Sequence, residues 1–179
     1  MDFLVGARVR LRPAVDTDSE RFGGILPHPE VARWWGDVDE PLSEQLREVL
    51  DPPEDTATFA IEAGGTAVGF IQFSEESTPK YRHAGIDIAV HPDWHGRGFG
   101  SDAIRTLARY LIRERGHHRL VIDPAASNEI AIRTYSRAGF RPVGVMRSYE
   151  RGPDGNWHDG LLMDLLAEDL TAPPHRPQH

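Results

Sequence analysis

Three glycines at alternate positions mark the segment of this chain best suited to chemistry. They are Gly96, Gly98 and Gly100, and they separate an apolar stretch from a long amphipathic one. Because glycine readily adopts positive φ, successive backbone N–H groups of such a turn can converge on an anion at the positive end of the following helix. The spacing therefore predicts a phosphate-binding loop. The alternative is a tight connection between a strand and a helix.

Two known phosphate loops do not fit these residues. A nucleotide-triphosphate loop needs Lys followed by Ser or Thr after its last glycine, and that pair is missing after Gly100. A dinucleotide-binding fold needs its third glycine one residue later, and an acidic residue beyond the next strand. If the loop binds phosphate, it therefore belongs to neither of these two classes.

A second segment carries polar side chains at helical spacing. Asn128 and Tyr135 are two helical turns apart, so both project from nearly the same side of a helix, with the small Ala131 between them. A weak acid held at a fixed position can protonate a leaving group, and Tyr135 is a candidate for that role. The alternative for Tyr135 is an aromatic ring packed against a sheet.

Carboxylates occur on the strands expected beside these segments. Asp87 falls on the polar side of an alternating stretch, and Asp123 ends the next strand just before Pro124. A carboxylate at either place can attract an ammonium group and, directly or through water, accept its proton. The alternatives are structural: Asp123 starts a turn before proline, and Asp87 pairs with an arginine such as Arg82.

Hydrophobic periodicity and turn residues indicate the elements that must position these groups. We expect strands over residues 7–13, 58–62, 67–73, 82–90, 118–123, 141–150 and 157–166. We expect helices over residues 16–26, 43–50, 98–115 and 128–139, with a loop carrying His28, Trp34 and Trp35 between the first two. This order predicts an α/β fold, with a mixed sheet and helices on both of its faces.

Composition limits the possible partners. The length of 179 residues suits one domain, which we place at residues 1–170, and the proline-rich residues 171–179 should form a flexible tail. No stretch is long and apolar enough to span a membrane, so we expect a cytoplasmic protein. A net charge of -8 argues against nucleic acid and suits a small cationic substrate, unless it serves solubility alone. Without cysteine, and without histidines at zinc-site spacing, we expect no metal.

The glycine loop and the Asn–Tyr segment together resemble the core of the GCN5-related N-acetyltransferases, the GNAT family. The family loop reads Gln/Arg-x-x-Gly-x-Gly/Ala, and residues 95–100 fit it, except that His95 stands where Gln or Arg is usual. The family helix reads Asn-x-x-Ala-x-x-x-Tyr-x-x-x-Gly-Phe, which residues 128–140 match. The resemblance covers about residues 7–170. It implies a central mixed, mostly antiparallel sheet.

The resemblance also implies acetyl-CoA as the cofactor. Asn128 would bond an amide carbonyl of pantetheine, Tyr135 would protonate the departing thiolate, and Asp87 would take the proton of the amine. The other cofactor-binding positions would be Ala89 and Val90 at the strand end, the loop residues His95, Gly96, Arg97, Gly98, Phe99, Gly100 and Ser101, and Ala131 on the helix.

Residues 31–36, 85–87 and 123–133 are similar to one branch, the aminoglycoside 6'-N-acetyltransferases. By this resemblance Trp34 and Trp35 wall the acceptor pocket, while Asp87 and Asp123 bind amines of the acceptor. A protein N-terminus and a siderophore or polyamine amine are rival acceptors. A catalytically silent acyl-CoA sensor is the alternative outside enzymes. We expect a monomer or a homodimer with a small cationic amine as its partner.

Overall fold

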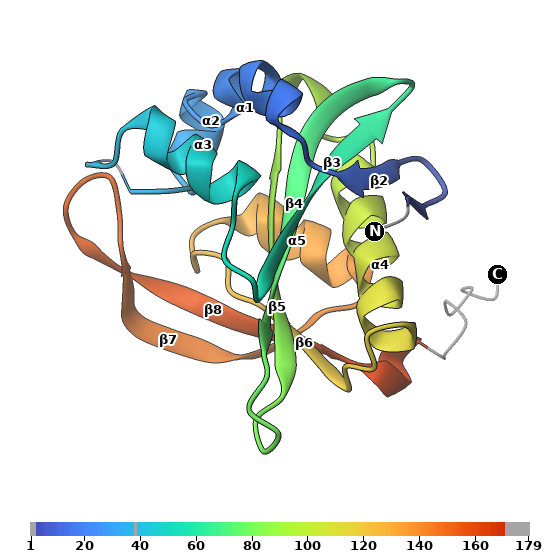
Figure 1. The fold of residues 1–179 in the computed structure, drawn as a ribbon. Coiled ribbons are helices and arrows are strands. Elements are labelled where there is room, and N and C mark those ends of the chain that lie inside the picture. Colours follow the sequence, from blue (N-terminus) through green and yellow to red (C-terminus); the bar gives the residue numbers. More distant parts are fainter. Residues whose placement is uncertain (1–2, 38, 171–179) are drawn as a thin grey trace, which may run out of the picture.

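One mixed sheet organises the computed structural model, which describes residues 3–37 and 39–170 (Figure 1). Its strands are β1 (Leu4–Val5), β2 (Arg10–Pro13), β3 (Thr56–Ala63), β4 (Thr66–Glu76), β5 (His83–Val90), β6 (Arg119–Ile122), β7 (Arg141–Arg151) and β8 (Trp157–Leu166). The α-helices are α1 (Ser19–Ile25), α2 (Pro29–Ala32), α3 (Leu42–Leu50), α4 (Phe99–Arg113) and α5 (Glu129–Ala138). Short 3₁₀ helices cover Asp16–Asp18, Pro92–Trp94 and Ala167–Leu170.

The sheet parts along one line. Its strand order is β1-β2-β3-β4-β5-β6-β8-β7, and neighbouring strands are antiparallel except β5 and β6. That parallel pairing is short, with Ala84 opposite Leu120 and Gly85 opposite Val121. Toward Val90 the two strands share no register, so the backbone of β5 faces a gap. The predicted mixed, mostly antiparallel sheet is confirmed. At the gap a ligand can reach the backbone of β5.

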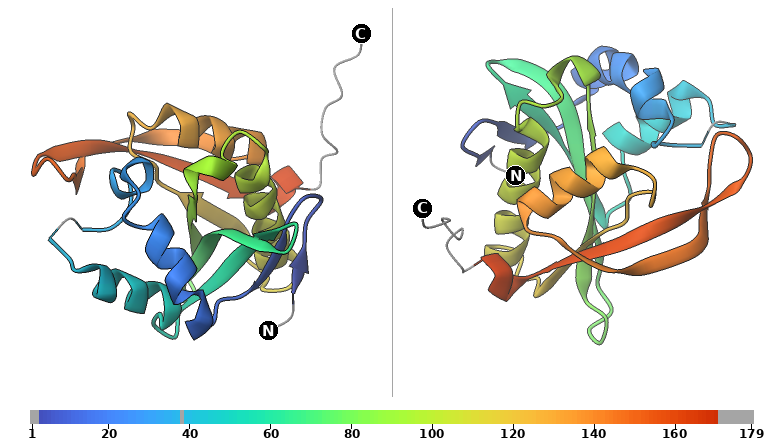
Figure 2. Two further views of the ribbon diagram at one scale, coloured as in Figure 1. Left: turned by 90° about the horizontal axis from the view of Figure 1, so that it is seen from above. Right: turned by 180° about the vertical axis from the view of Figure 1, so that it is seen from behind.

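Helices cover both faces of the sheet, as the sequence predicts (Figure 2). On one face α4 buries Ile104 and Leu107 in a large apolar cluster that includes Ile86 of β5. On the other face the α1–α3 segment contributes Phe22 to a second cluster that includes Ala89. Successive side chains of β5 therefore point to opposite faces of the sheet, as expected. The end of β5 lies between the α4 layer and the α1–α3 layer. In the described ranges no helix has the length and apolarity needed to cross a membrane.

The N-terminal strand is shorter than predicted. Residues 7–9 form a bend, because the backbone N–H groups of Ala7, Arg8 and Val9 all donate to the carboxylate of Asp102, at 3.3, 2.7 and 3.1 Å. Asp102 lies in the first turn of α4 and is 2% exposed. The bend is therefore fastened to the start of α4, and β2 begins only at Arg10. Strand β1 has only two residues, too few for a periodic pattern.

Local signals place the start of α4 and both ends of α5 where the sequence predicts them, whereas α4 ends at Arg113, two residues before the predicted end. Gly98, at φ 79°, precedes α4, and Gly139, at φ 111°, follows α5. Asn128 caps α5, since its side-chain oxygen accepts from the Ala131 N–H at 3.2 Å. The predicted loop after α1 is wrong in part, because α2 forms there with His28 as its capping residue. The expected tail at residues 171–179 lies outside the described residues.

Candidate active site

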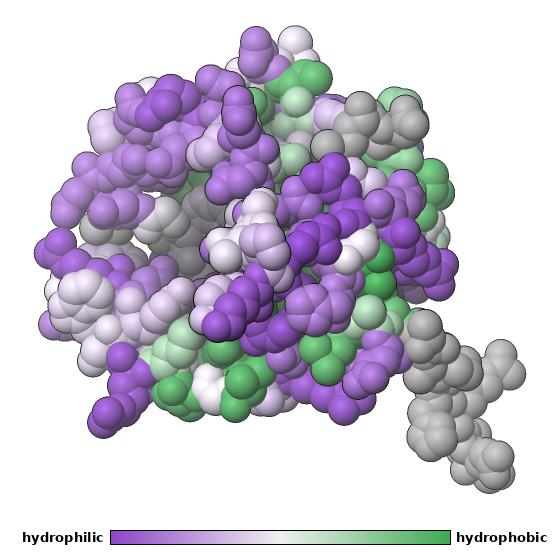
Figure 3. All heavy atoms as spheres, turned by 60° about the horizontal axis from the view of Figure 1, so that its bottom comes forward, coloured by the Kyte–Doolittle hydropathy of each residue, from purple (hydrophilic) through white to green (hydrophobic). Residues whose placement is uncertain are grey.

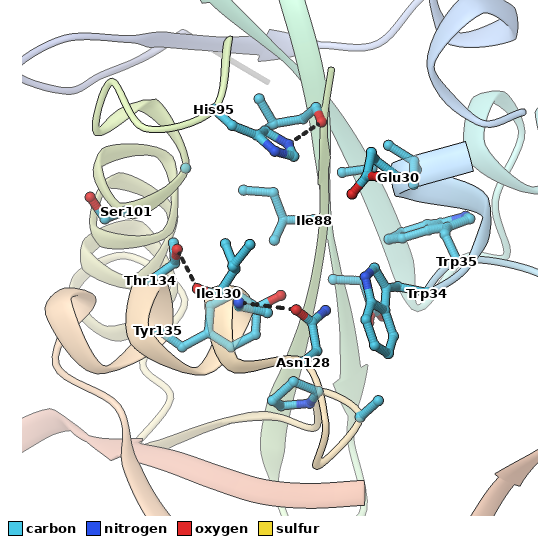
Figure 4. Close-up of a pocket in the computed structure, with 18 of the residues that line it drawn as sticks. Glu30, Trp34, Trp35, Ile88, His95, Ser101, Asn128, Ile130, Thr134 and Tyr135 are labelled. Atoms are coloured by element: carbon cyan, nitrogen blue, oxygen red, sulfur yellow. Dashed lines mark hydrogen bonds between the residues drawn. The ribbon is translucent and has the colours of Figure 1, made fainter. Parts of the chain in front are cut away.

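A cavity of about 660 Å³ opens where β5 and β6 part. The start of α4 and one side of α5 form one wall, and the α2 segment forms the opposite wall (Figure 4). The hairpin of β7 and β8 closes the far end through Tyr149 and Glu150. The surface is hollowed on the side where this hairpin faces the α2–α3 segment (Figure 3). The cavity therefore brings together most of the residues singled out by sequence.

The glycine loop forms the start of α4. Gly96 and Gly98 have φ values of 73° and 79°, in the left-handed region that side chains disfavour. The first intrahelical bond runs from the Asp102 N–H to the Gly98 carbonyl at 3.1 Å. The N–H groups of Phe99, Gly100 and Ser101 therefore precede any helical acceptor, and they lie at the positive end of the helix. This geometry fits a diphosphate.

The side chains of the loop lie away from the glycines. The imidazole Nε2 of His95 is 2.7 Å from the carbonyl oxygen of Val90, which ties the loop to the end of β5 (Figure 4). The guanidinium of Arg97 lies 5.0 Å from the ring centroid of Trp94, and Trp94 contacts Phe99. His95 thus has a definite structural role, whereas Arg97 packs on an aromatic ring.

The end of β5 offers free backbone groups to the cavity. The His91 N–H donates to Val68 of β4 at 2.8 Å, and bonding alternates along an antiparallel pair. The backbone groups of Ala89 therefore face β4, while those of Ile88 and Val90 face the gap. Since His95 already bonds the Val90 carbonyl, an extended amide chain in the gap can pair with both backbone groups of Ile88 and with the Val90 N–H, and Ala89 contributes only to the wall.

Asn128 and Tyr135 both line the cavity from α5 (Figure 4). The Asn128 oxygen is used by the helix cap, so its NH₂ group is the part able to donate to a ligand carbonyl. Tyr135 is half-buried and packs against the main apolar cluster, so the packing interpretation also holds. Burial, together with the charges of Asp87 and Asp123, raises the pKa of Tyr135. Its hydroxyl therefore keeps its proton at neutral pH.

Carboxylates gather at the hairpin end of the cavity. Desolvation, and then the charges of Asp123 and Glu150, raise the pKa of Asp87 to about 6. The Tyr149 hydroxyl donates to Asp123 at 2.6 Å, and this bond helps to raise the pKa of Tyr149 to about 12. Desolvation and Asp123 also raise the pKa of Glu150. Shared repulsion of this kind is relieved when a cation binds.

The arginine partner considered for Asp87 is bonded elsewhere, and Asp123 has a partner from another strand. Arg82 donates to the backbone carbonyls of Arg115 and Gly116 at 2.6 and 2.7 Å, so it does not pair with Asp87. Among the described residues, Asp87 has no hydrogen bond or ion pair. Asp123 is held by the hydroxyl of Tyr149 rather than serving only as a turn residue.

Trp34 and Trp35 have different surroundings. The ring of Trp35 meets that of Phe70 edge-on, with centroids 5.0 Å apart, and packs against the second apolar cluster. Trp34 lies over the cavity from the α2 segment (Figure 4). The guanidinium of Arg33 stacks on its ring, 4.7 Å from the ring centroid. Both rings line the cavity, so Trp35 anchors the wall and Trp34 offers its face.

An acidic groove continues from the cavity. It has a volume of about 360 Å³ and shares Asp87 and Asp123 with the main cavity. Asp55, Glu75 and Glu76 also line it, although Glu75 is paired with Arg115 and His117. Within the described segments, no group of three or more His, Cys, Asp or Glu side chains has the arrangement of a metal site.

Several lining residues were not found from the sequence: Glu30, Trp94, Ile130, Thr134, Arg137, Tyr149 and Glu150. Tyr149 and Glu150 belong to a hairpin strand without any motif. A register shift between Met146 and Glu150, with Ser148 at φ 46°, turns Tyr149 toward Asp123. No local signal in the sequence indicates that irregularity. By contrast, Glu30 follows His28 and Pro29, which form the N-terminal cap of α2. A capping residue followed by proline is a sequence pattern that indicates the start of a helix.

Comparison with known proteins identifies the class. A family model described as the acetyltransferase (GNAT) family matches residues 22–140. The chain belongs to this family, and it is an acyl-CoA-dependent N-acetyltransferase. The residues of the glycine loop lie within the matched range. The resemblance inferred from the motifs is confirmed.

Individual relatives point in two directions. Aminoglycoside N(6')-acetyltransferase type 1 of Klebsiella pneumoniae is 26% identical over 164 residues, covering 82% of this chain and 79% of its own. Spermidine N(1)-acetyltransferase of Escherichia coli K12 is 22% identical over 172 residues, covering 94% and 91%. The solved structure of AAC(6')-Ib in complex with ribostamycin and coenzyme A has a TM-score of 0.76 at 23% identity, covering 94% of this chain and 99% of that one. That likeness confirms the fold.

Proposed function

We propose that this protein transfers the acetyl group of acetyl-CoA directly to a primary amine of a small polycation, and that the acceptor is the 6'-amine of an aminoglycoside. The observation that carries the proposal is the cluster of Asp87, Asp123 and Glu150 at one end of a cavity whose other end is the glycine loop. Negative charge at one end and anion-binding amides at the other suit a cationic acceptor and a phosphorylated donor.

The donor would lie along the wall made by α4, β5 and α5. When bound, acetyl-CoA supplies an acetyl group activated as a thioester. The N–H groups at the start of α4 hold the diphosphate, as helix N-termini do for anions. The backbone groups of Ile88 and the Val90 N–H would pair with pantetheine amides, and the Asn128 NH₂ group would donate to a carbonyl. These contacts aim the acyl end toward Asp87.

Asp87 and Tyr135 carry the proton transfers. An alkylamine is mostly protonated at neutral pH and must lose a proton before it can act as a nucleophile. Asp87, with its pKa of about 6, is ionised at neutral pH and is closer to that task than an ordinary aspartate. Tyr135 keeps its proton because its pKa is raised, and it donates that proton to the departing sulfur. Asp123, held by Tyr149, binds the ammonium and orients it.

The acceptor side favours a molecule with several amines. The acidic groove beyond Asp87 gives further ammonium groups a place to bind, and the face of Trp34 suits either a sugar ring or a cation. A linear polyamine is the second candidate, because this groove is lined by carboxylates that can bind ammonium groups along a chain. A protein N-terminus is less well served, since it presents a single ammonium group. A silent acyl-CoA sensor would have no need of Asp87 and Tyr135 in one cavity.

A thiol-release assay tests the proposal. Purified protein with acetyl-CoA is offered kanamycin, spermidine or an N-terminal peptide at pH 7.5, and free coenzyme A is measured. We expect kanamycin to give the highest kcat/KM and acetylation at its 6'-amine by mass spectrometry. Higher kcat/KM with spermidine would transfer the acceptor assignment to polyamines. Coenzyme A binding without turnover of any amine would support the sensor and contradict the proposal.

A further inference from the structure

Arg8 lies against the glycine loop, although ninety positions separate it from Gly98 in the sequence. A Cβ placed on Gly98 would be 3.6 Å from both Cδ and Nε of Arg8. Gly98 lines the cavity and immediately precedes α4. The side chain of Arg8 therefore lies beside Gly98, the residue that directly precedes the free N–H groups at the start of α4.

The position of Arg8 is built into the fold. Its backbone N–H donates to Asp102 of α4 at 2.7 Å, and the neighbouring N–H groups of Ala7 and Val9 bond the same carboxylate. A Cβ on Gly6 would come within 2.5 Å of Asp102 Oδ2 and of Thr106 Oγ1, so the bend packs tightly on α4. The backbone of Arg8 cannot move away from the helix start without losing these contacts.

The charge of Arg8 is not neutralised by the protein. Arg10 pairs with Glu62 at 2.6 Å, and Arg12 pairs with Asp18 at 2.6 Å. Within the described part of the chain, the exposed guanidinium of Arg8 has no hydrogen bond and no ion pair. A cation beside the positive end of a helix is unfavourable by itself. An anion bound between them would be attracted both to the guanidinium of Arg8 and to the positive end of α4.

We infer that the guanidinium of Arg8 binds a phosphate group of coenzyme A, together with the N–H groups at the start of α4. Arg8 then recognises the nucleotide half of the donor and has no part in the chemistry of the acyl end. This inference rests on the proposed donor site. It adds a side chain that carries positive charge, whereas the loop itself supplies mainly backbone dipoles.

Binding measurements on matched variants test the inference. Arg8→Gln removes the charge and keeps the backbone bonds to Asp102. Arg113→Gln is the control, because Arg113 is an exposed arginine near the other end of the same helix, roughly 20 Å away. We expect Arg8→Gln to raise the Kd of coenzyme A about tenfold and Arg113→Gln to leave it within about twofold. Pantetheine, which has no phosphate, should bind both variants as it binds the wild type.

Two further readouts separate recognition from a general structural defect. With acetyl-CoA as the varied substrate, Arg8→Gln should raise KM about tenfold and leave kcat at saturation unchanged, and its melting temperature should match that of the wild type. Dephospho-coenzyme A, which lacks the 3'-phosphate, shows which phosphate Arg8 binds. If Arg8→Gln binds it about tenfold more weakly than the wild type does, Arg8 contacts the diphosphate. If the two proteins bind it equally well, Arg8 contacts the 3'-phosphate.

The possible failures are distinguishable. If wild-type protein binds coenzyme A and Arg8→Gln binds it equally well, the inference about Arg8 is overturned and the donor site stands. A parallel loss of pantetheine affinity in Arg8→Gln would also overturn it, since that indicates a distorted site. If wild-type protein does not bind coenzyme A at all, the proposed function and this inference fail together.

Discussion

The charge of Asp87 is unfavourable in the folded protein, and the same property suits this residue to accept a proton. Its carboxylate faces the cavity, close to Asp123 and Glu150, and its pKa is about 6 because the ionised form is poorly solvated and repelled. The same repulsion makes the site attractive to an ammonium group and makes Asp87 a better base. Active sites commonly keep such unfavourable charges because function requires them.

Replacement of Asp87 by Asn is expected to slow acetyl transfer by about 10²–10⁴-fold, because the proton acceptor is lost. In the wild type, kcat/KM should fall as the pH drops through about 6, where Asp87 becomes protonated. The variant should lack that limb of the profile. Asp51→Asn, at an exposed carboxylate after α3, is the control and should change neither quantity. A profile with the same acid limb in Asp87→Asn would assign the base elsewhere.

The same substitution should stabilise the folded protein at alkaline pH. Asp87 has a pKa of about 6 when folded and an ordinary value of 3.8, so the folded state holds its proton more tightly. As the pH rises from 3.8 to about 6, the stability that protonated Asp87 contributes is lost. Above about pH 6 the charge of Asp87 opposes folding. Asp87→Asn should therefore melt at a higher temperature than wild type at pH 8, with a smaller difference at pH 5. An equal or lower melting temperature at pH 8 would contradict the charge argument.

Tyr135 is expected to act on rate more than on binding. Tyr135→Phe keeps the ring that packs on the apolar cluster and removes the hydroxyl, so kcat should fall about 10²-fold or more. The Kd of coenzyme A should stay within about twofold, since no phosphate contact changes. Tyr81→Phe, at a tyrosine that is 64% exposed, serves as the matched control. Full turnover by Tyr135→Phe would remove Tyr135 as the acid.

At the scale of elements, the loop before α4 depends on backbone freedom at Gly98. Its φ of 79° lies in the left-handed region, which costs a side-chain-bearing residue about 1–2 kcal/mol. The contact that a Cβ would make with Arg8, at 3.6 Å, is an ordinary one. The strain therefore comes from the backbone and not from a clash.

Gly98→Ala should lower the free energy of unfolding by about 1–2 kcal/mol and weaken coenzyme A binding, because the loop must shift to relieve its φ. Gly24→Ala is the control. Gly24 lies in α1 with open space around it and a helical φ, so alanine there should stabilise by about 0.5–1 kcal/mol. Chemical denaturation and titration calorimetry measure the two effects. Unchanged stability and affinity in Gly98→Ala would show that the loop tolerates another conformation.

At the scale of the whole molecule, the parting of β5 and β6 joins two separately packed layers around one cavity. The α4–α5 layer provides the proposed donor wall, and the α1–α3 layer provides Trp34 and Trp35. The β7–β8 hairpin adds Tyr149 and Glu150 from a third direction. A ligand that fills the cavity therefore contacts several parts of the fold at once.

Coenzyme A should accordingly protect the fold against heat. At about 100 times its Kd, a ligand bound only by the folded state contributes about 2.7 kcal/mol. For a chain of this length, that corresponds to a rise in melting temperature of roughly 5–10 °C. Pantetheine at the same concentration should give a smaller shift, because it lacks the phosphates. The absence of any shift with saturating coenzyme A would count against the donor site.

Features that depend on neighbours along the chain could be predicted from the amino-acid sequence. The glycine spacing before α4, the cap at Asn128, the stop at Gly139 and the alternation of β5 are all local, because φ, capping and side-chain period are set within a few residues. These features were enough to predict the fold class and the face of α5 that carries Tyr135, and phosphate binding by the glycine loop stays a prediction.

Contacts between residues far apart along the chain could be found only from the folded structure. The bond from Tyr149 to Asp123 depends on an irregular hairpin, and the approach of Arg8 to Gly98 depends on a carboxylate of α4 that holds the N-terminal bend. The pKa of Asp87 likewise depends on Asp123 and Glu150, which other strands bring near it. Contacts of this kind follow from the packing of whole elements, because sheet register and layer stacking place residues together that share no local pattern.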